Sequence, residues 1–459
     1  MLAQTWKNAS PNFSINKNNN GTHSMTDNNS SSASTLNNVY ASARARNYAL
    51  GLLTVVYTFN FIDRQLLAIL QESIKADLSL SDSQLGLLAG FAFALFYVTA
   101  GIPIARFADR SNRRNIVAGS IFLWSLMTAV SGYAQNFFQL LLARIGVGVG
   151  EAGGSPPSHS IISDIFPPEK RAGALGIYST GVNIGILFGF LLGGWLNEYF
   201  GWRVAFMVVG APGILIALIV RFTLAEPIRG ISEQKVVSHE APPFTMILSL
   251  LWSRRSFRHM AFGAALNAFV GYGVASWLAS FFIRSHEMST GELGTWLAII
   301  TGVCGAIGVS FGGMFADKLG QRDKRWYMWL PAITGFIVVP FMVPVYLVSS
   351  AYVALTLSII PGLLQNVYLG STIATTHALV GLRMRALSSA ILFLILNLIG
   401  LGLGPLVIGM LSDHLSPNHG ADSLRQAMLY VLPAVMFWSS FHFYKAASTL
   451  REDLAAAPD

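Results

Sequence analysis

The sequence predicts an all-α integral membrane protein with twelve spanning helices, arranged as two halves of six. Of its 459 residues, 53% are hydrophobic and only 11% are charged, whereas soluble domains usually carry about 25% charged residues. Apolar runs of about 20 residues recur along the chain, which is the length that a helix needs to cross a bilayer. Such runs are typical of helices and not of the alternating strands of a membrane β-barrel. A single long polar segment in the middle of the chain separates six runs from the other six.

This reading divides the chain into five parts. Residues 1–46 are rich in Asn and Ser and poor in apolar residues, which predicts a disordered cytoplasmic tail. An N-terminal six-helix half over 47–224, a cytoplasmic linker over 225–256, a C-terminal six-helix half over 257–447 and a cytoplasmic tail over 448–459 follow. The expected spans are 47–69, 83–105, 115–133, 137–163, 171–197, 202–224, 257–283, 292–315, 326–347, 351–379, 386–411 and 425–446.

The positions of the basic residues predict the orientation of these spans. Most of the 30 Lys and Arg residues fall in segments that lie on one side if the N-terminus is cytoplasmic, as the positive-inside rule requires. The net charge of +8 therefore indicates topology and not nucleic-acid binding. We expect a monomeric multi-pass protein of a plasma membrane, the inner membrane of a bacterium, with both termini cytoplasmic and membrane lipids around it.

Two of the apolar runs contain charged residues. The first span carries Asp63 and Arg64, and the fourth carries Arg144 and Glu151. Charges within spanning helices are costly and usually face an interior or a cavity. Arg144 and Glu151 are seven residues apart, nearly two helical turns, so they share a face about 10 Å apart along the axis. Helix rise places Asp63 near the level of Arg144.

These residues admit two interpretations. An acid, a base and a second acid at graded depth could carry a proton or hold a zwitterionic ligand. Alternatively, Asp63 forms a buried ion pair that only fixes the packing of two helices. Whether Asp63 would pair with Arg144 or with its neighbour Arg64 is open at this stage. After Glu151, Pro156 and Pro157 are expected to break the helix.

The spans of the C-terminal half contrast with these charged helices. Spans seven to ten have no charged residue well inside their apolar regions, but they carry polar and aromatic residues. A charged half that faces an uncharged, aromatic half suits an amphipathic substrate, although single aromatic residues could equally be interface anchors. The candidate pocket residues are Arg64, Asn267, Tyr272, Trp277, Gln365, Asn366 and Tyr368.

A repeated motif follows the second and the eighth spans. ARFADRSNRR (105–114) and GMFADKLGQR (313–322) resemble the loop motif of the major facilitator superfamily, G-x-x-x-D-[RK]-x-G-[RK]-[RK]. The first copy departs from it, because Ala105 and Asn112 replace the two glycines. The resemblance implies the major facilitator fold, with two parallel halves and a cytoplasmic gate whose carboxylates cap helices of the opposite half. The gate residues would be Asp109, Arg110, Arg113, Asp317, Lys318 and Arg322.

Two further motifs narrow the resemblance. NFIDR in the first span and RIGVGVGEAG in the fourth look like those of the Spinster branch of the superfamily. That branch is associated with export of lysophospholipids and sphingosine phosphate, with proton coupling proposed for some members. The resemblance implies that Asp63, Arg144 and Glu151 are the functional polar residues.

Together these features predict a proton-coupled secondary transporter of an amphipathic anionic or zwitterionic lipid, of the lysophospholipid class, that works by alternating access. A small organic anion or a drug is the alternative substrate, and a receptor without transport is a second alternative. The sequence contains one cysteine, Cys304, and no Walker loop, zinc motif or nucleophile elbow. We therefore expect no enzymatic activity, no metal and no cofactor, with a proton gradient as the energy source.

Overall fold

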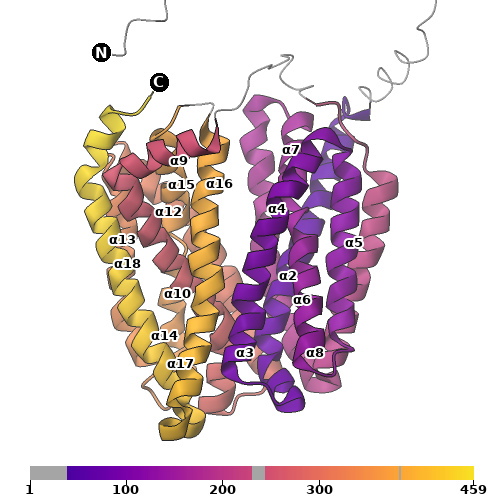
Figure 1. Ribbon diagram of the computed structural model, residues 1–459, viewed down its shortest axis with the longest axis vertical. Helices are drawn as coiled ribbons and strands as arrows, with labels where there is room; N and C mark the ends of the chain where they lie inside the picture. Colours follow the sequence, from indigo (N-terminus) through magenta and orange to yellow (C-terminus); the bar gives the residue numbers. More distant parts are fainter. Residues whose placement is uncertain (1–38, 230–242, 382–383, 459) are drawn as a thin grey trace, which may run out of the picture.

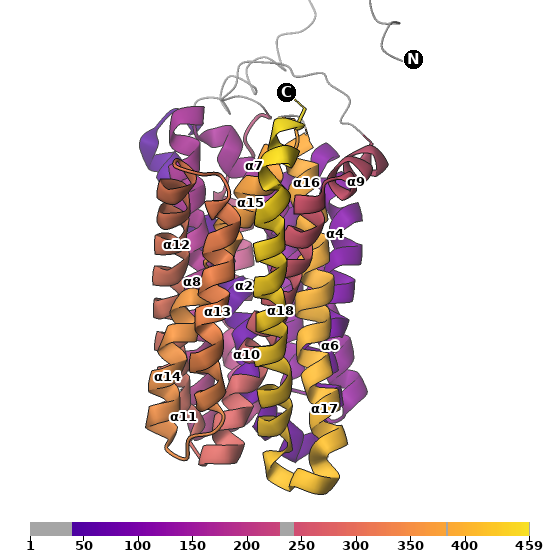
Figure 2. The same cartoon turned by 90° about the vertical axis from the view of Figure 1, so that its left-hand side faces the viewer.

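The computed structural model describes residues 39–229, 243–381 and 384–458, together with the side chains of these residues other than Ile102, Ala105, Asp109 and Ala386. The described residues form helices that run roughly parallel in two bundles side by side (Figure 1). The first helix begins and the last helix ends at the same end of the molecule, here called the terminal end; the opposite end is the far end (Figures 1 and 2).

The N-terminal bundle contains six helical rods. They are α2 (Ala43–Leu78); α3 (Asp82–Gly86), η1 (Leu87–Phe91) and α4 (Ala92–Arg110) in succession; α5 (Arg113–Ser131); α6 (Phe137–Ala152) with α7 (Ser155–Ile165); and the two rods of α8 (Pro168–Thr223). The rods of α8 meet at Gly201, whose φ of 80° is easily adopted only by glycine.

The C-terminal bundle also contains six rods, preceded by the short helix α9 (Phe244–Ser253). They are α10 (Arg255–His286); α11 (Thr290–Leu297), η2 (Ala298–Val303) and α12 (Cys304–Gly320); α13 (Trp326–Val345); α14 (Ala351–Leu364) with α15 (Tyr368–Ala378); α16 (Arg385–Ile395), η4 (Leu396–Leu403) and α17 (Gly404–His419); and, after η5 (Gly420–Asp422), α18 (Ser423–Ala455). The twelve rods of the described residues correspond to the twelve expected spans.

Some boundaries differ from the expectation. The helix α9 lies within 225–256, where the sequence indicated a polar loop. Its apolar residues Ile247 and Leu251 are fully buried, because they pack against the C-terminal bundle. The last helix, α18, continues to Ala455, so it includes most of the segment 448–459 that was expected to be a tail. Leu450 is fully buried there, which gives the extra turns an apolar contact.

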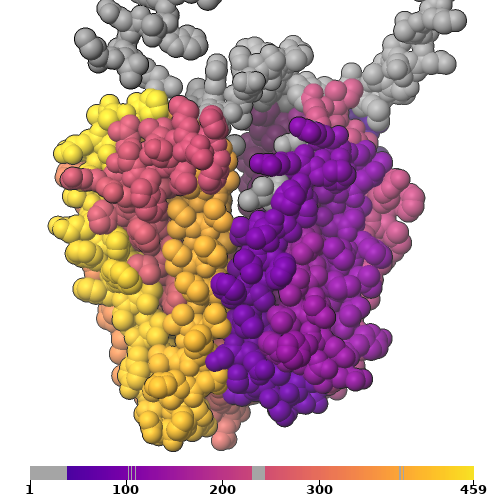
Figure 3. Space-filling model, viewed as in Figure 1, coloured from indigo at the N-terminus to yellow at the C-terminus, as the bar shows by residue number. Residues whose placement is uncertain are grey.

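The buried apolar residues show how the bundles meet. One cluster at the far end draws on both bundles, with Leu66 and Leu70 of α2 packed in the same core as Trp277 and Phe281 of α10. Toward the terminal end the core divides into a cluster that belongs almost wholly to the N-terminal bundle and one that belongs to the C-terminal bundle. Figure 3 shows the same arrangement, with the bundles in contact in the lower part of the view and separated in the upper part. The molecule is therefore closed at the far end and open at the terminal end.

Candidate functional site

Four charged side chains meet in the middle of the N-terminal bundle. Asp63 and Arg64 come from α2, and Arg144 and Glu151 come from α6. Asp63 and Arg144 are each 2% exposed and Glu151 is 1% exposed. The Nε atom of Arg64 donates a hydrogen bond to Oε2 of Glu151 at 2.8 Å. The partner of Arg64 is thus the glutamate on α6 and not the adjacent Asp63.

Several polar atoms of this quartet are buried without a hydrogen-bond partner among the described residues. They are Nε and Nη1 of Arg144, Oδ1 of Asp63 and Oε1 of Glu151. Arg144 lies within electrostatic range of both carboxylates. Buried charged groups are unfavourable unless they are paired and hydrogen-bonded. Donors and acceptors left in this condition can bind a ligand or a proton strongly.

Aromatic rings surround the two arginines. The guanidinium of Arg64 lies 5.0 Å from the ring centre of Phe61, 5.0 Å from that of Phe93 and 5.2 Å from that of Tyr97. The guanidinium of Arg144 lies 5.7 Å from the ring of Phe93 on the same helix as Tyr97. A cation over a ring contributes about 0.5–2 kcal/mol. The rings therefore hold both cations away from bulk water without neutralising their charge.

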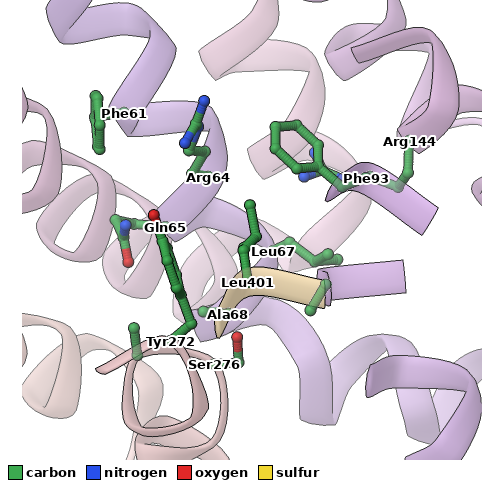
Figure 4. A pocket seen from close by; sticks show the side chains of 12 residues that line it. Phe61, Arg64, Gln65, Leu67, Ala68, Phe93, Arg144, Tyr272, Ser276 and Leu401 are labelled. Carbon is green, nitrogen blue, oxygen red and sulfur yellow. The ribbon is translucent and has the colours of Figure 1, made fainter. Parts of the chain in front are cut away.

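A pocket adjoins this quartet and contains about 500 Å³ of space not filled by protein atoms, part of which is open to solvent. Figure 4 shows its lining, with Arg64 and Arg144 on one side and Tyr272 and Ser276 on the other. The C-terminal bundle contributes Tyr272, Ala275 and Ser276 of α10 and Leu401 of η4, none of which is charged. The remaining lining residues come from the N-terminal bundle and are Phe61, Arg64, Gln65, Leu67, Ala68, Ala89, Phe93 and Arg144. One wall of the pocket thus carries charge and the other does not.

The other candidate pocket residues of the C-terminal bundle lie elsewhere. Trp277 is fully buried and donates its Nε1 hydrogen to the carbonyl oxygen of Pro405 at 2.8 Å, so it supports the packing of α10 on α17. The Oδ1 atom of Asn267 accepts a hydrogen bond from Nε2 of Gln365 at 2.8 Å. Tyr368 is buried against Phe443, and Asn366 is exposed. Of the six uncharged candidates, only Tyr272 lines the pocket.

Sequence reasoning missed Phe61, Phe93, Tyr97 and Ser276. A signal for two of them exists in FAFALFY (91–97), because residues four apart on a helix share one face. Phe93 and Tyr97 have that spacing and both contact Arg64. Nothing in the sequence indicates that this face meets the arginine of another helix.

The break after Glu151 lies slightly earlier than the prolines. The helix α6 ends at Ala152, and α7 begins at Ser155, so that Pro156 and Pro157 occupy its first turn. Proline is tolerated there because the first N–H groups of a helix have no partner within the helix. The interruption is therefore at Gly153 and Gly154, immediately after the buried carboxylate.

Two residues of the expected gate, Arg113 and Asp317, make their described contacts on their own side of the molecule and not with the opposite bundle. Arg113 is 1% exposed and binds Asp164, Ser160 Oγ at 2.7 Å and Glu226 Oε1 at 2.8 Å. Asp317 accepts a hydrogen bond from the hydroxyl of Tyr327 at 3.2 Å. Arg110, Lys318 and Arg322 are exposed. Asp109 is on α4, but its side chain lies outside the described residues. This matches a molecule that is open at the terminal end.

Comparison with known proteins defines the class. Residues 53–405 match the family model of the Major Facilitator Superfamily, so this chain belongs to that superfamily of transporters and is a multi-pass membrane protein. It is 33% identical over 406 residues to an MFS-type efflux pump of Mycolicibacterium smegmatis, which covers 88% of this chain and 94% of the relative. It is 25% identical over 445 residues to protein spinster homolog 3 of Danio rerio, covering 91% of this chain and 88% of that protein.

A solved structure narrows the resemblance. The fold matches the crystal structure of a bacterial homologue of the human lysosomal transporter Spinster, in an inward-facing and unoccupied conformation, with a TM-score of 0.78 and 35% identity over 91% of this chain and 98% of the other. The protein is therefore a Spinster-like secondary transporter of the major facilitator superfamily and not an enzyme. The predicted fold class and family resemblance are confirmed.

Proposed function

We propose that this transporter moves an amphipathic anionic or zwitterionic lipid-like substrate, of the lysophospholipid class, in exchange for or together with protons. The observation that carries the proposal is Arg144. Its Nε and Nη1 atoms are buried with no hydrogen-bond partner in the part of the chain that the structure describes, and the residue lines a pocket with an uncharged opposite wall. A guanidinium suits the oxygens of a phosphate or carboxylate. The head group would bind Arg144, and the apolar chain would lie along Leu401 and Tyr272.

Proton coupling follows from the arrangement of the charges. In the described state Glu151 forms an ion pair with Arg64, and Asp63 interacts electrostatically with Arg144. A proton on Glu151 would release Arg64, and a proton on Asp63 would leave Arg144 free for the anionic head group. The two carboxylates and the anionic substrate thus compete for the same two cations. A proton on a carboxylate therefore favours substrate binding, which links the two binding free energies.

Alternating access would exchange the described state, open at the terminal end, for one open at the far end. We propose that the terminal end is cytoplasmic, in the inner membrane of a bacterium, because the exposed basic residues of the loop motifs gather there. In the opposite state, Asp109 and Asp317 would cap helices of the other bundle and close the cytoplasmic side. The linker 225–256 would join two halves that move as units.

A small organic anion or a drug is the second candidate substrate. It is favoured by the similarity to a protein described as an efflux pump and by the modest volume of the pocket. Both candidates use Arg144 and the two carboxylates in the same way. They differ in whether the uncharged wall has to hold an acyl chain.

The test uses purified protein in liposomes with an imposed pH gradient and a fluorescent lysophospholipid. Wild type is compared with Arg144→Ala and Glu151→Gln, and Glu452→Gln on the exposed end of α18 serves as a matched control. We expect pH-dependent lipid movement in wild type and control and its loss in both site variants. Movement of a small organic anion with no lipid movement would favour the second candidate. Undiminished transport with the same pH dependence in Glu151→Gln would contradict the coupling.

A further inference from the structure

Two pairs of sequence segments repeat at the far end of the molecule. SDSQLG (81–86) begins α3 in the N-terminal bundle, and STGELG (289–294) begins α11 in the C-terminal bundle. Their first residues, Ser81 and Ser289, both cap the helix by accepting a backbone hydrogen bond. The segments GGWLNE (193–198) of α8 and IGMLSD (408–413) of α17 likewise correspond, each with a carboxylate at its end.

The first pair of packed helices is α17 and α3, which lie side by side at the far end (Figure 1). The carboxylate of Asp413 accepts hydrogen bonds from the backbone nitrogens of Asp82 at 3.0 Å and Ser83 at 2.7 Å. The helices approach so closely that a Cβ atom on Gly409 would lie 2.3 Å from the carbonyl oxygen of Asp82. A carboxylate of one bundle therefore caps the first turn of a helix of the other bundle.

The second pair of packed helices is α8 and α11, which are joined in the same way. Oε2 of Glu198 accepts hydrogen bonds from the backbone nitrogen of Gly291 at 3.0 Å and from Oγ1 of Thr290 at 3.3 Å. A Cβ atom on Gly194 would lie 2.3 Å from the carbonyl oxygen of Thr290. Corresponding residues thus make corresponding contacts in the two pairs of helices.

We propose that Asp413 and Glu198 form a far-end latch, in which each carboxylate caps a helix of the opposite bundle and holds the far side of the transporter closed. Helix N-termini attract negative charge, so each contact is lost when the bundles separate at this end. The latch is the counterpart of the one expected from Asp109 and Asp317, which lie near the other ends of the rods that begin with α3 and α11. Each rod would then be capped at its first turn in one state and would supply a carboxylate in the other.

Other ionic contacts reinforce the first pair. Arg284 of α10 binds Asp82 at 2.7 Å and Glu72 at 2.8 Å, and Ser412 donates to Asp82 at 2.6 Å. In the second pair of helices, Thr290 occupies the sequence position that corresponds to Asp82, so these ionic contacts have no equivalent there. The capping carboxylate is the feature common to both pairs, so the latch is assigned to it. Asp413 is half-buried and Glu198 is exposed, and solvent weakens exposed charges, so Asp413 should contribute more.

The test measures the distance between the bundles at the far end and needs no substrate. Because Cys304 is the only cysteine, Cys304→Ala provides a background for spin labels at Tyr133→Cys and Ser350→Cys, two exposed sites in far-end loops of the two bundles. Pulsed electron paramagnetic resonance in lipid nanodiscs then reports the populations. In Asp413→Asn the amide NH₂ would face a backbone N–H group, so one of the two bonds is lost.

We expect a short distance in the parent protein and an added long component in Asp413→Asn, with the ratio of open to closed far ends raised about tenfold. Glu198→Gln should shift the ratio in the same direction by less. Asp422→Asn is the control, because this partly exposed carboxylate of η5 pairs with Arg425 of α18, within its own bundle. A distance distribution identical to that of the parent in either latch variant overturns the proposal. Glu198 is exposed, so its variant tests the proposal even if Asp413→Asn does not fold.

Discussion

Arg64 is held by two kinds of interaction that lysine would not reproduce. Its Nε atom binds Glu151, and its planar guanidinium faces the rings of Phe61, Phe93 and Tyr97. Lysine is a compact, strongly hydrated charge on a flexible stem and does not stack in the same way. The geometry at this residue therefore depends on the shape of the cation as well as on its charge.

We expect Arg64→Lys to lower the initial rate of substrate transport about tenfold, since charge-assisted hydrogen bonds contribute about 1.5–3 kcal/mol. The rate is measured in liposomes at a fixed pH gradient. Arg203→Lys is the matched control, because Arg203 also lies over a ring, that of Trp202 at 4.2 Å, and pairs with an acid, Asp77, but does so at the surface. Wild-type rates in Arg64→Lys would show that only the charge matters.

Asp323 provides a comparison for the pH dependence of transport. The side chain of Arg325 first, and its backbone N–H group next, lower the pKa of Asp323 to about 2. Because the folded protein favours the ionised carboxylate, Asp323 stabilises the fold at every pH above the ordinary pKa of 3.8. This stabilisation is lost as the pH falls from that value toward 2. Asp323 therefore does not titrate between about pH 5 and about pH 8.

The pH profile of transport should accordingly be unchanged in Asp323→Asn over that range. The same profile should lose its midpoint in Glu151→Gln if the buried quartet carries the proton. Parallel measurements of rate against pH in the two variants decide this. A displaced midpoint in Asp323→Asn would place a titrating group in the terminal-end loops instead.

The sequence was sufficient to locate the charged residues of the site but not their pairing. Asp63, Arg144 and Glu151 could be placed by counting helical turns, because charge in an apolar run is rare and helix rise is fixed. Asp63 and Arg64 are adjacent, however, and a small rotation of α2 decides which of them faces Glu151. That rotation depends on how α2 packs against its neighbours, which the sequence does not reveal.

At the scale of the elements, Arg113 connects three segments near the terminal end. It joins α5 to α7 through Asp164 and Ser160 and to the segment after α8 through Glu226 and the carbonyl oxygen of Pro227. The resemblance to the loop motif implied that Arg113 belongs to a gate between the bundles. In the described state, however, its buried side chain holds together three segments of the N-terminal side. The sequence motif singled out Arg113 as important, but only the packed structure reveals the residues that it contacts.

Replacing Arg113 should therefore reduce stability more than replacing its exposed neighbour in the motif. We expect Arg113→Met to lower the free energy of unfolding by about 3 kcal/mol, since loss of one partner of a buried ion pair leaves carboxylates without compensating charge. Arg110→Met is the control. Thermal unfolding in detergent measures both, and equal midpoints for the two variants would show that the buried contacts of Arg113 contribute little.

The lengths of elements were predicted less well than their number. The helix α9 was missed because its ten residues, although mostly apolar, are too few to span a membrane and follow a polar stretch of sequence. Its existence depends on a surface of the C-terminal bundle that buries Ile247 and Leu251. The spanning helices needed no such partner to be recognised, because lipid requires their backbone groups to be bonded within the helix.

At the scale of the whole molecule, the division of the core determines which side is open. One apolar cluster joins the bundles at the far end, and separate clusters serve them at the terminal end. The pocket lies between these regions, with Ser276 of α10 on its wall. A reagent that enters from the terminal end should reach Ser276, while the joint core blocks entry from the far end.

This asymmetry can be measured with a single cysteine. In the Cys304→Ala background, Ser276→Cys should react with a membrane-impermeant thiol reagent in vesicles that present the terminal end to the medium, and slowly in vesicles of the opposite orientation. Adding Asp317→Asn should increase the rate from the terminal end, because closure there would lose a capping carboxylate. Ser439→Cys, buried in α18 with a bond to the carbonyl oxygen of Gly263, controls for unfolding and should not react from either side. Equal rates at Ser276→Cys from both sides would mean that the closed far end does not persist in the membrane, and an unchanged rate in Asp317→Asn would remove Asp317 from the gate.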